Sequence, residues 1–148
     1  MVRIRLPLVP RWLRWAAVAL VALVILTYSI VPPPGSGTFQ TGPFGLVGLS
    51  KWLHLLAYAG LAATLAYTLH DSPRPDWQVL AIVFVAAASY GAGIELLQST
   101  LTARHAAYDD VLVNALGAGV AVAGWRLIGR YVRFYRVRRR EDLRVPVR

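Results

Sequence analysis

The chain has 148 residues, of which 57% are hydrophobic and only 16% charged, and its formal net charge is +9 at pH 7. Soluble domains contain roughly 45–50% apolar and about 25% charged residues, so this composition excludes a disordered chain, which is poor in apolar residues, and argues against a soluble, basic nucleic-acid-binding protein. The two kinds of residue are also separated, because positions 15–50 hold no charged residue and no histidine, whereas positions 130–148 hold eight arginines.

Four apolar segments predict an integral membrane protein. A hydrocarbon core about 30 Å thick needs roughly 20 helical residues, and the predicted spans are residues 13–31, 52–69, 77–101 and 111–128. The first segment also fits a signal peptide, because Arg11 and Arg14 precede it, but its apolar run is long and no small-residue cleavage site precedes the prolines that follow. We therefore expect an uncleaved first span and an all-α bundle of four transmembrane helices.

The distribution of lysine and arginine predicts the orientation of this bundle, since basic residues concentrate on the cytoplasmic side. Fourteen of the sixteen lie on one side of a four-span chain, and only Lys51 and Arg104 lie on the other. We therefore expect both termini in the cytoplasm and a multi-pass protein of the cytoplasmic (inner) membrane. The loop at 32–50 and the connection at 102–109 then face outward.

The chain is expected to divide into a basic cytoplasmic N-terminal arm (1–14), a membrane domain (15–128) and an Arg-rich cytoplasmic tail (129–148). Projected at about 100° per residue, the end of the last span and the tail separate arginines from large apolar residues. The two faces are Arg126, Arg130, Arg133, Arg136 and Arg140 against Leu127, Tyr131, Phe134 and Tyr135. This layout predicts a helix in the membrane interface, with its arginines on anionic headgroups, and we prefer that reading to nucleic-acid binding.

Polar side chains are predicted to meet at the extracytoplasmic ends of the second, third and fourth helices. Three helix faces carry them: Lys51, His54 and Tyr58; Glu95 and Gln98; and Asp110, Asn114 and Gly117. Ionisable groups inside a membrane are costly and usually functional. Because facing lipid would leave these groups unsatisfied, we expect the three faces to turn toward one another.

Within this cluster we assign Glu95 and His54 as a hypothetical acid/base pair that Asp110 orients. Lys51 and Arg104 are expected to hold a phosphate or carboxylate, and Gln98, Asn114 and Tyr58 complete the substrate-binding set. Three other interpretations stay open, namely an interfacial anchor for Lys51, a hydrogen-bonded core histidine for His54, and packing for Tyr58. Whether the protein is an enzyme or an assembly protein with a structural polar network also stays open.

We expect no cofactor and no metal. The chain has no cysteine, which excludes disulfides and thiolate sites, and three histidines with scattered carboxylates form no tight metal motif. A proton-coupled transporter is disfavoured because the inner halves of the spans carry no path of ionisable groups. Small residues of the last span are predicted to form a close-packing seam; they are Ala115, Gly117, Gly119 and Ala123.

The order of these motifs resembles the VanZ-like family of small integral membrane proteins. The resemblance covers about residues 51–124 and is carried by Lys51-x-x-His54-x-x-x-Tyr58, Glu95-x-x-Gln98, and Arg104 followed by Asp110-x-x-x-Asn114-x-x-Gly117. It implies a multi-span membrane protein of the cell envelope, with a link to resistance to the glycopeptide teicoplanin. It also implies signature roles for Lys51, His54, Glu95, Gln98, Arg104, Asp110 and Asn114. Ser50 and Ala107 depart from the family, where polar or acidic residues are common.

The combined expectation is a protein that binds or modifies an envelope lipid or a lipid-linked anionic group. Its expected partners are membrane lipids and a lipid-linked envelope substrate, with no nucleic acid. The substrate, the reaction and the existence of a homo-oligomer are left open by the sequence.

Overall fold

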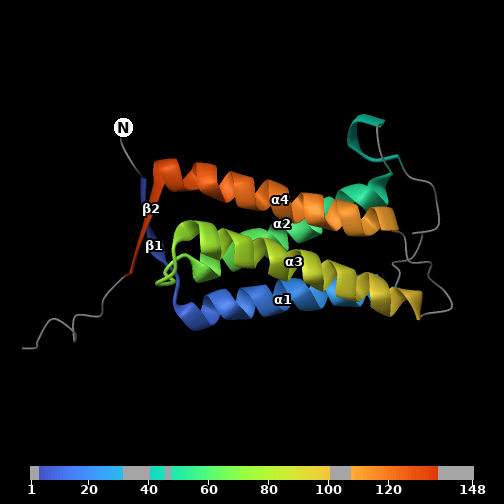
Figure 1. Ribbon diagram of the computed structural model, residues 1–148, viewed down its shortest axis with the longest axis horizontal. Helices are drawn as coiled ribbons and strands as arrows, with labels where there is room; N and C mark the ends of the chain where they lie inside the picture. The colour runs from blue at the N-terminus through green and yellow to red at the C-terminus, as the bar shows by residue number, and fades with distance from the viewer. Residues whose placement is uncertain (1–3, 32–40, 46–47, 101–107, 137–148) are drawn as a thin grey trace, which may run out of the picture.

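Four long helices lie side by side, and each runs antiparallel to the next along the chain (Figure 1). They are α1 (Arg11–Ile30), α2 (Leu49–Leu69), α3 (Asp76–Ser99) and α4 (Tyr108–Tyr131). The structure, a computed structural model, describes residues 4–31, 41–45, 48–100 and 108–136. All four helices are long and apolar enough to cross a membrane. The four predicted spans are therefore confirmed, and each helix begins one to three residues before the predicted start.

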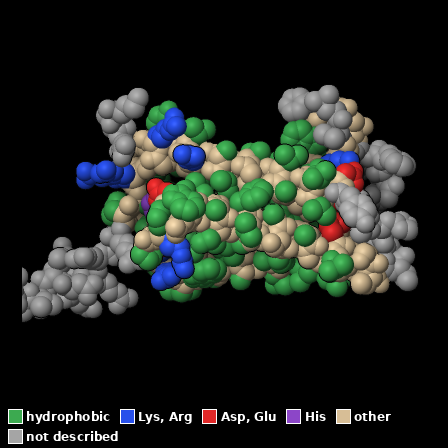
Figure 2. All heavy atoms as spheres, in the orientation of Figure 1, with side chains coloured by type: hydrophobic (Ala, Val, Ile, Leu, Met, Phe, Trp, Pro, Cys, Tyr) green, Lys and Arg blue, Asp and Glu red, His purple; other side chains and the backbone are tan. Residues whose placement is uncertain are grey.

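The sides of the bundle are apolar and its charges gather at the two ends, as Figure 2 shows. Large apolar residues of three helices each expose 60% or more of their surface: Leu20 of α1, Val85 and Leu96 of α3, and Leu116 of α4. Large apolar side chains exposed all along a bundle are a liability in water and fit a lipid environment. The chain is accordingly a multi-pass membrane protein.

Alanine and branched aliphatic residues, together with Tyr58, fill the space between the helices, and α2 packs against all three of the others. The buried residues of the core are Ile25, Tyr58, Leu61, Ala62, Ala66, Val79, Val83, Ala87, Ile94 and Ala118. Helix α4 approaches α2 most closely at Gly117, where a Cβ atom would lie 2.3 Å from the carbonyl oxygen of Leu55. The predicted seam of small residues is present at this position, because only a hydrogen fits between the two backbones.

The two ends of the described chain pair with each other across one end of the bundle. Strands β1 (Ile4–Leu8) and β2 (Val132–Arg136) run parallel, with Ile4 opposite Val132 and Leu8 opposite Arg136 (Figure 1). We call this the terminal end; it also carries the turn between α2 and α3. The opposite end, where α2 and α4 begin and α3 ends, is called the site end below.

Strand β2 corrects the prediction that the tail continues as an interfacial helix. Helix α4 ends at Tyr131, and Val132–Arg136 is extended. Strand geometry sends successive side chains to opposite faces, so Phe134 packs on the bundle while Arg133 is exposed. The Phe134 ring stacks on Trp125 at 5.8 Å and meets His70 edge-on at 4.9 Å. These aromatic contacts and the pairing with β1 stabilise the extended conformation of residues 132–136 over the helix that the sequence pattern predicts. The rest of the tail, residues 137–148, lies outside the described part of the chain.

His70 stands beside this aromatic cluster, just after the end of α2. Desolvation by the surrounding side chains holds the pKa of His70 below its usual value of 6.5, with Arg14 acting in the same direction and Asp76 and Asp71 opposing it. His70 is therefore neutral at pH 7 and packs as an aromatic ring.

Arg14, the last residue of the predicted N-terminal arm, is a buried residue of α1. Its residue exposure is only 4%. The guanidinium forms a two-pronged ion pair with Asp71, at 3.1 and 2.9 Å, and also donates to the backbone oxygen of Thr68 at 2.9 Å. In return, the Thr68 hydroxyl donates to the Arg14 carbonyl oxygen at 3.3 Å. Arg14 thus satisfies the last carbonyls of α2 and locks α1 against that helix.

Candidate functional site

Three helices bring ionisable side chains together at the site end. His54 comes from α2, Glu95 from α3 and Asp110 from α4, and one nitrogen or carboxylate oxygen of each lies within 4.8 Å of the others. Glu95 is buried, with 5% exposure, and the other two are half-buried. We refer to His54, Glu95 and Asp110 as the triad.

The antiparallel arrangement explains why the triad forms. His54 lies in the second turn of α2 and Asp110 in the first turn of α4, whereas Glu95 lies in the last turns of α3. Two helices that begin and one that ends therefore present these residues at the same depth (Figure 1). The structure brings together three of the predicted site residues in this way, and the catalytic roles assigned to them stay predictions.

Asn114 fixes the orientation of the His54 ring. Its Oδ1 lies 3.0 Å from His54 Nδ1, and the Asn114 side chain is buried, with 1% exposure. Because an amide oxygen only accepts hydrogen bonds, Nδ1 is the donor in this contact, and Nε2 is then the accepting nitrogen of the neutral ring. Asp110 and Asn114 are one helical turn apart on α4, so a single helix face presents both an acid and the residue that orients the imidazole.

Gly91 is a site residue that the sequence analysis missed. A Cβ atom at this position of α3 would lie 3.0 Å from Tyr58 Cε1 and 3.1 Å from Asn114 Cβ. The absence of a side chain therefore lets α3 pack directly on both residues. Gly91 precedes Glu95 by four positions and so shares its helix face. This spacing is the sequence signal that could have identified Gly91. Tyr58 is buried, with 1% exposure, and its ring lies 6.5 Å from that of Tyr90, so its visible contacts are packing contacts.

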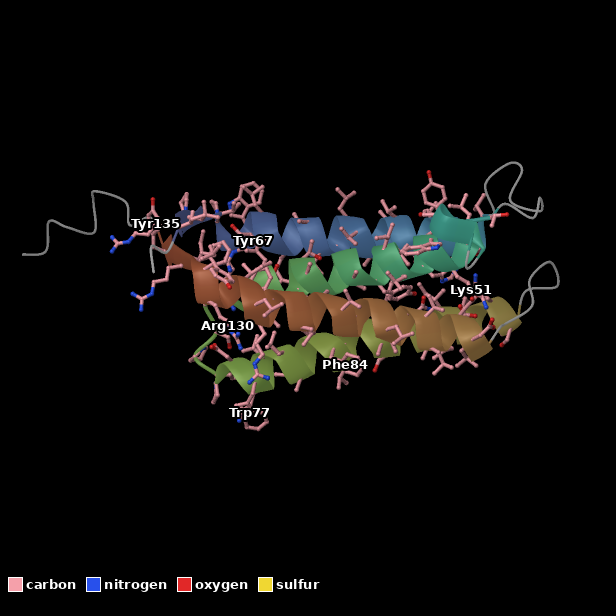
Figure 3. All side chains as sticks on the ribbon, turned by 90° about the horizontal axis from the view of Figure 1, so that it is seen from above. Lys51, Tyr67, Trp77, Phe84, Arg130 and Tyr135 are labelled. Atoms are coloured by element: carbon pink, nitrogen blue, oxygen red, sulfur yellow. The ribbon has the colours of Figure 1, made fainter. Side chains whose placement is uncertain are left out.

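Lys51 lies at the rim of the site, where Figure 3 shows it at the end of the bundle away from Tyr67 and Tyr135. Its ammonium group forms an ion pair with Asp109, and both side chains are exposed, at 38% and 56%. The sequence analysis treated Asp109 only as part of the outer turn. In the structure, Asp109 pairs with Lys51, one turn before His54 on α2 and next to Asp110 on α4.

Two predicted site residues remain, Gln98 and Arg104, and the structure describes only the first of them. Gln98 is buried and donates from Nε2 to the backbone oxygen of Ser29, at 2.9 Å, so that it ties α3 to the end of α1. A ligand-binding role for Gln98 stays a prediction. Arg104 lies outside the described residues.

The triad also changes the expectation about metals. The sequence showed no compact metal motif, because its histidines and carboxylates are scattered along the chain. The fold collects one imidazole and two carboxylates from three helices into a group with the spacing of a metal site. Spacing along the sequence does not reveal such a group, since metal ligands need to be neighbours only in space; the absence of a metal stays a prediction.

In a comparison with protein-family models, the model described as VanZ/LLP1 matches residues 6–129, which is most of the chain. Neither the curated proteins nor the solved structures contain a significant match to the chain.

Proposed function

The chain belongs to the VanZ/LLP1 family, and from this membership and the geometry of the site end we propose that the protein binds or modifies an envelope lipid or a lipid-linked anionic group. The observation that carries the proposal is the triad, because His54, Glu95 and Asp110 meet at one end of a membrane-spanning bundle. That is the depth at which lipid headgroups lie. Ionisable groups in such a place are costly to bury and are usually kept for function.

Positive charge for the anionic group would come from Lys51 and Arg104. Lys51 stands at the rim, and its exposed pair with Asp109 exchanges readily for a phosphate or carboxylate. Arg104, in the connection between α3 and α4, would add a two-pronged contact. The proposal places this end of the bundle outside the cytoplasmic membrane, because fourteen of the sixteen basic residues belong to the opposite side.

If the ligand is modified, the proton chemistry would fall to the triad. His54 Nε2 has a lone pair because Nδ1 donates to Asn114, so it can accept a proton and pass it to Glu95, with Asp110 orienting the pair. The family membership further supports a contribution to glycopeptide resistance of the teicoplanin type. Both statements are part of the proposal.

Replacing Arg104 by alanine is expected to remove a bound lipid. Charge-assisted hydrogen bonds contribute about 1.5–3 kcal/mol, so the lipid-bound fraction should fall roughly tenfold or more. The measurement is native mass spectrometry of the gently solubilised full-length protein. Arg74→Ala is the matched control, because it removes an exposed arginine at the terminal end. Equal lipid retention in both variants and the unaltered protein, or no retained lipid at all, would contradict the proposal.

A second function is favoured by the hydrogen bonds between helices. His54 to Asn114 joins α2 to α4, and Gln98 to Ser29 joins α3 to α1, so the polar residues also act as a network that holds the helices in register. An interaction or assembly protein without chemistry would need only this network, in which each contact contributes about 0.6–2 kcal/mol.

Glu95→Gln separates the two functions. A lipid site predicts a normal amount of folded protein, measured by size-exclusion chromatography, with loss of lipid and of teicoplanin tolerance in a susceptible host. A purely structural network predicts the reverse, namely a lower yield and apparent Tm with unchanged tolerance per folded molecule. Gly93→Ala, on the same stretch of α3 with open space around it, controls for expression.

A further inference from the structure

We propose that His54, Glu95 and Asp110 bind one divalent transition-metal ion of the Zn²⁺ or Mn²⁺ class. Their nearest candidate ligand atoms lie within 4.8 Å of one another. Three ligands that each lie about 2.1 Å from one ion are roughly 3.4–3.6 Å from one another, so side-chain movements of about 1 Å would close the site. All three residues lie on helices of the bundle, which hold the site more rigidly than loops do.

The surroundings of His54 give independent support. Metal-binding histidines typically use their second ring nitrogen to donate to a buried oxygen, which fixes the ring and strengthens the ligand. Asn114 supplies that oxygen at 3.0 Å from Nδ1, and its side chain is 1% exposed. Its Nδ2 is buried and makes no hydrogen bond within the described residues. Asn114 therefore has the contact and the burial expected of a residue that orients a metal-binding histidine.

The triad offers a cation two carboxylates and an imidazole. Glu95 and Asp110 bring their carboxylates close together beside the His54 ring, and groups of these kinds are the usual protein ligands of Zn²⁺ and related ions. Lys51 is engaged at the rim with a third carboxylate, that of Asp109. A divalent ion within the triad would be held by the buried carboxylate of Glu95 and the half-buried carboxylate of Asp110, and it would turn the site toward binding anions.

The donor set selects the class of metal. One imidazole and two carboxylates suit Zn²⁺ or Mn²⁺, whereas Ca²⁺ takes six to eight oxygen ligands. Three protein ligands leave at least one coordination position open for water. Occupation of that position by a phosphate oxygen of a lipid rests on the proposed function, but metal binding itself does not.

Metal titration of the purified full-length protein tests this inference. The protein in detergent is first treated with a chelator. One sample is incubated with ZnCl₂ or MnCl₂ and desalted, and its metal content is measured by elemental mass spectrometry. The affinity is measured by calorimetric titration of the metal-free protein with the same salts. We expect one ion per chain. His54→Gln, Glu95→Gln and Asp110→Asn should abolish this binding, and Asn114→Ala should weaken it about 10–100-fold, because it removes the group that orients the imidazole.

Two matched controls should keep the ion. Asp109→Asn changes the neighbouring carboxylate outside the triad, and His70→Gln changes the histidine at the terminal end. If Asp109→Asn loses as much metal as Asp110→Asn, or if neither ion binds the unaltered protein, the inference is wrong. If the Glu95→Gln protein fails to fold, the test uses His54→Gln and Asp110→Asn, because these two residues are only half-buried. Metal binding without lipid would leave the inference standing and contradict the proposed function, whereas retained lipid without metal would overturn the inference alone.

Discussion

Replacing Arg14 by alanine is expected to destabilise the folded protein by about 3–5 kcal/mol, the range for breaking a buried ion pair by removing one partner. The side chain of Arg14 is 3% exposed and that of Asp71 13%, so solvent screens this pair little. The substitution would leave the Asp71 carboxylate and the backbone oxygen of Thr68 without their main donor. Chemical unfolding of the protein in detergent micelles, followed by tryptophan fluorescence, measures the loss.

Two further variants make this result specific. Arg11→Ala removes an exposed arginine from the same helix end, and we expect a change within about 0.5 kcal/mol. Arg14→Lys keeps the charge but replaces a planar two-pronged donor with a single ammonium group, so part of the loss should remain. Equal stability of the Arg14→Ala and Arg11→Ala proteins would show that Arg14 serves only as an orientation signal.

Gly117→Ala is expected to separate α2 from α4. The added Cβ would lie 2.3 Å from the carbonyl oxygen of Leu55 and 3.2 Å from the backbone nitrogen of Ala59. Backbone atoms cannot rotate away as a side chain can, so the helices must move apart, at a cost at or above the roughly 1–3 kcal/mol typical of overpacking. The same movement would pull His54 away from Asn114. The expected readouts are a lower apparent Tm and a lower yield of monodisperse protein.

Gly124→Ala is the control for this substitution, since it lies two turns further along α4 and a Cβ there meets nothing within 4 Å. Alanine favours helix by up to about 1 kcal/mol relative to glycine, so this variant should be neutral or slightly more stable. Similar destabilisation by both alanines would mean that helix flexibility, rather than the close approach at Gly117, is what the glycines provide.

The spans were predictable because each depends on a run of consecutive apolar residues. Pro32 follows the end of α1, and the Asp-Ser-Pro-Arg-Pro turn from Asp71 precedes α3, so both helix limits were readable from the sequence. The close approach at Gly117 was also indicated, since small residues at helical spacing mark a packing seam in membranes. Periodicity likewise placed Asp110 and Asn114 on one face of α4.

Several features escaped the sequence because they depend on partners distant in the chain. Phe134 lies on a strand rather than a helix because β1 and the rings of Trp125 and His70 are available to it. Arg14 looked like another flanking arginine, and only its contact with Asp71 distinguishes it from Arg11. Nothing in the local pattern around Gln98 indicated that its amide would meet Ser29 rather than a ligand.

By itself, the sequence determined that this is a four-span membrane protein and which polar residues share a helix face. Both are local properties, since hydropathy sums over neighbouring residues and helical periodicity relates positions three or four apart. Only the tertiary structure decided that His54, Glu95 and Asp110 meet while Gln98 turns to α1. That outcome depends on how each helix is rotated about its own axis. Close packing sets this rotation, with Gly117 against the backbone of α2 and Gly91 against the side chains of Tyr58 and Asn114. No single segment contains both partners of such a contact.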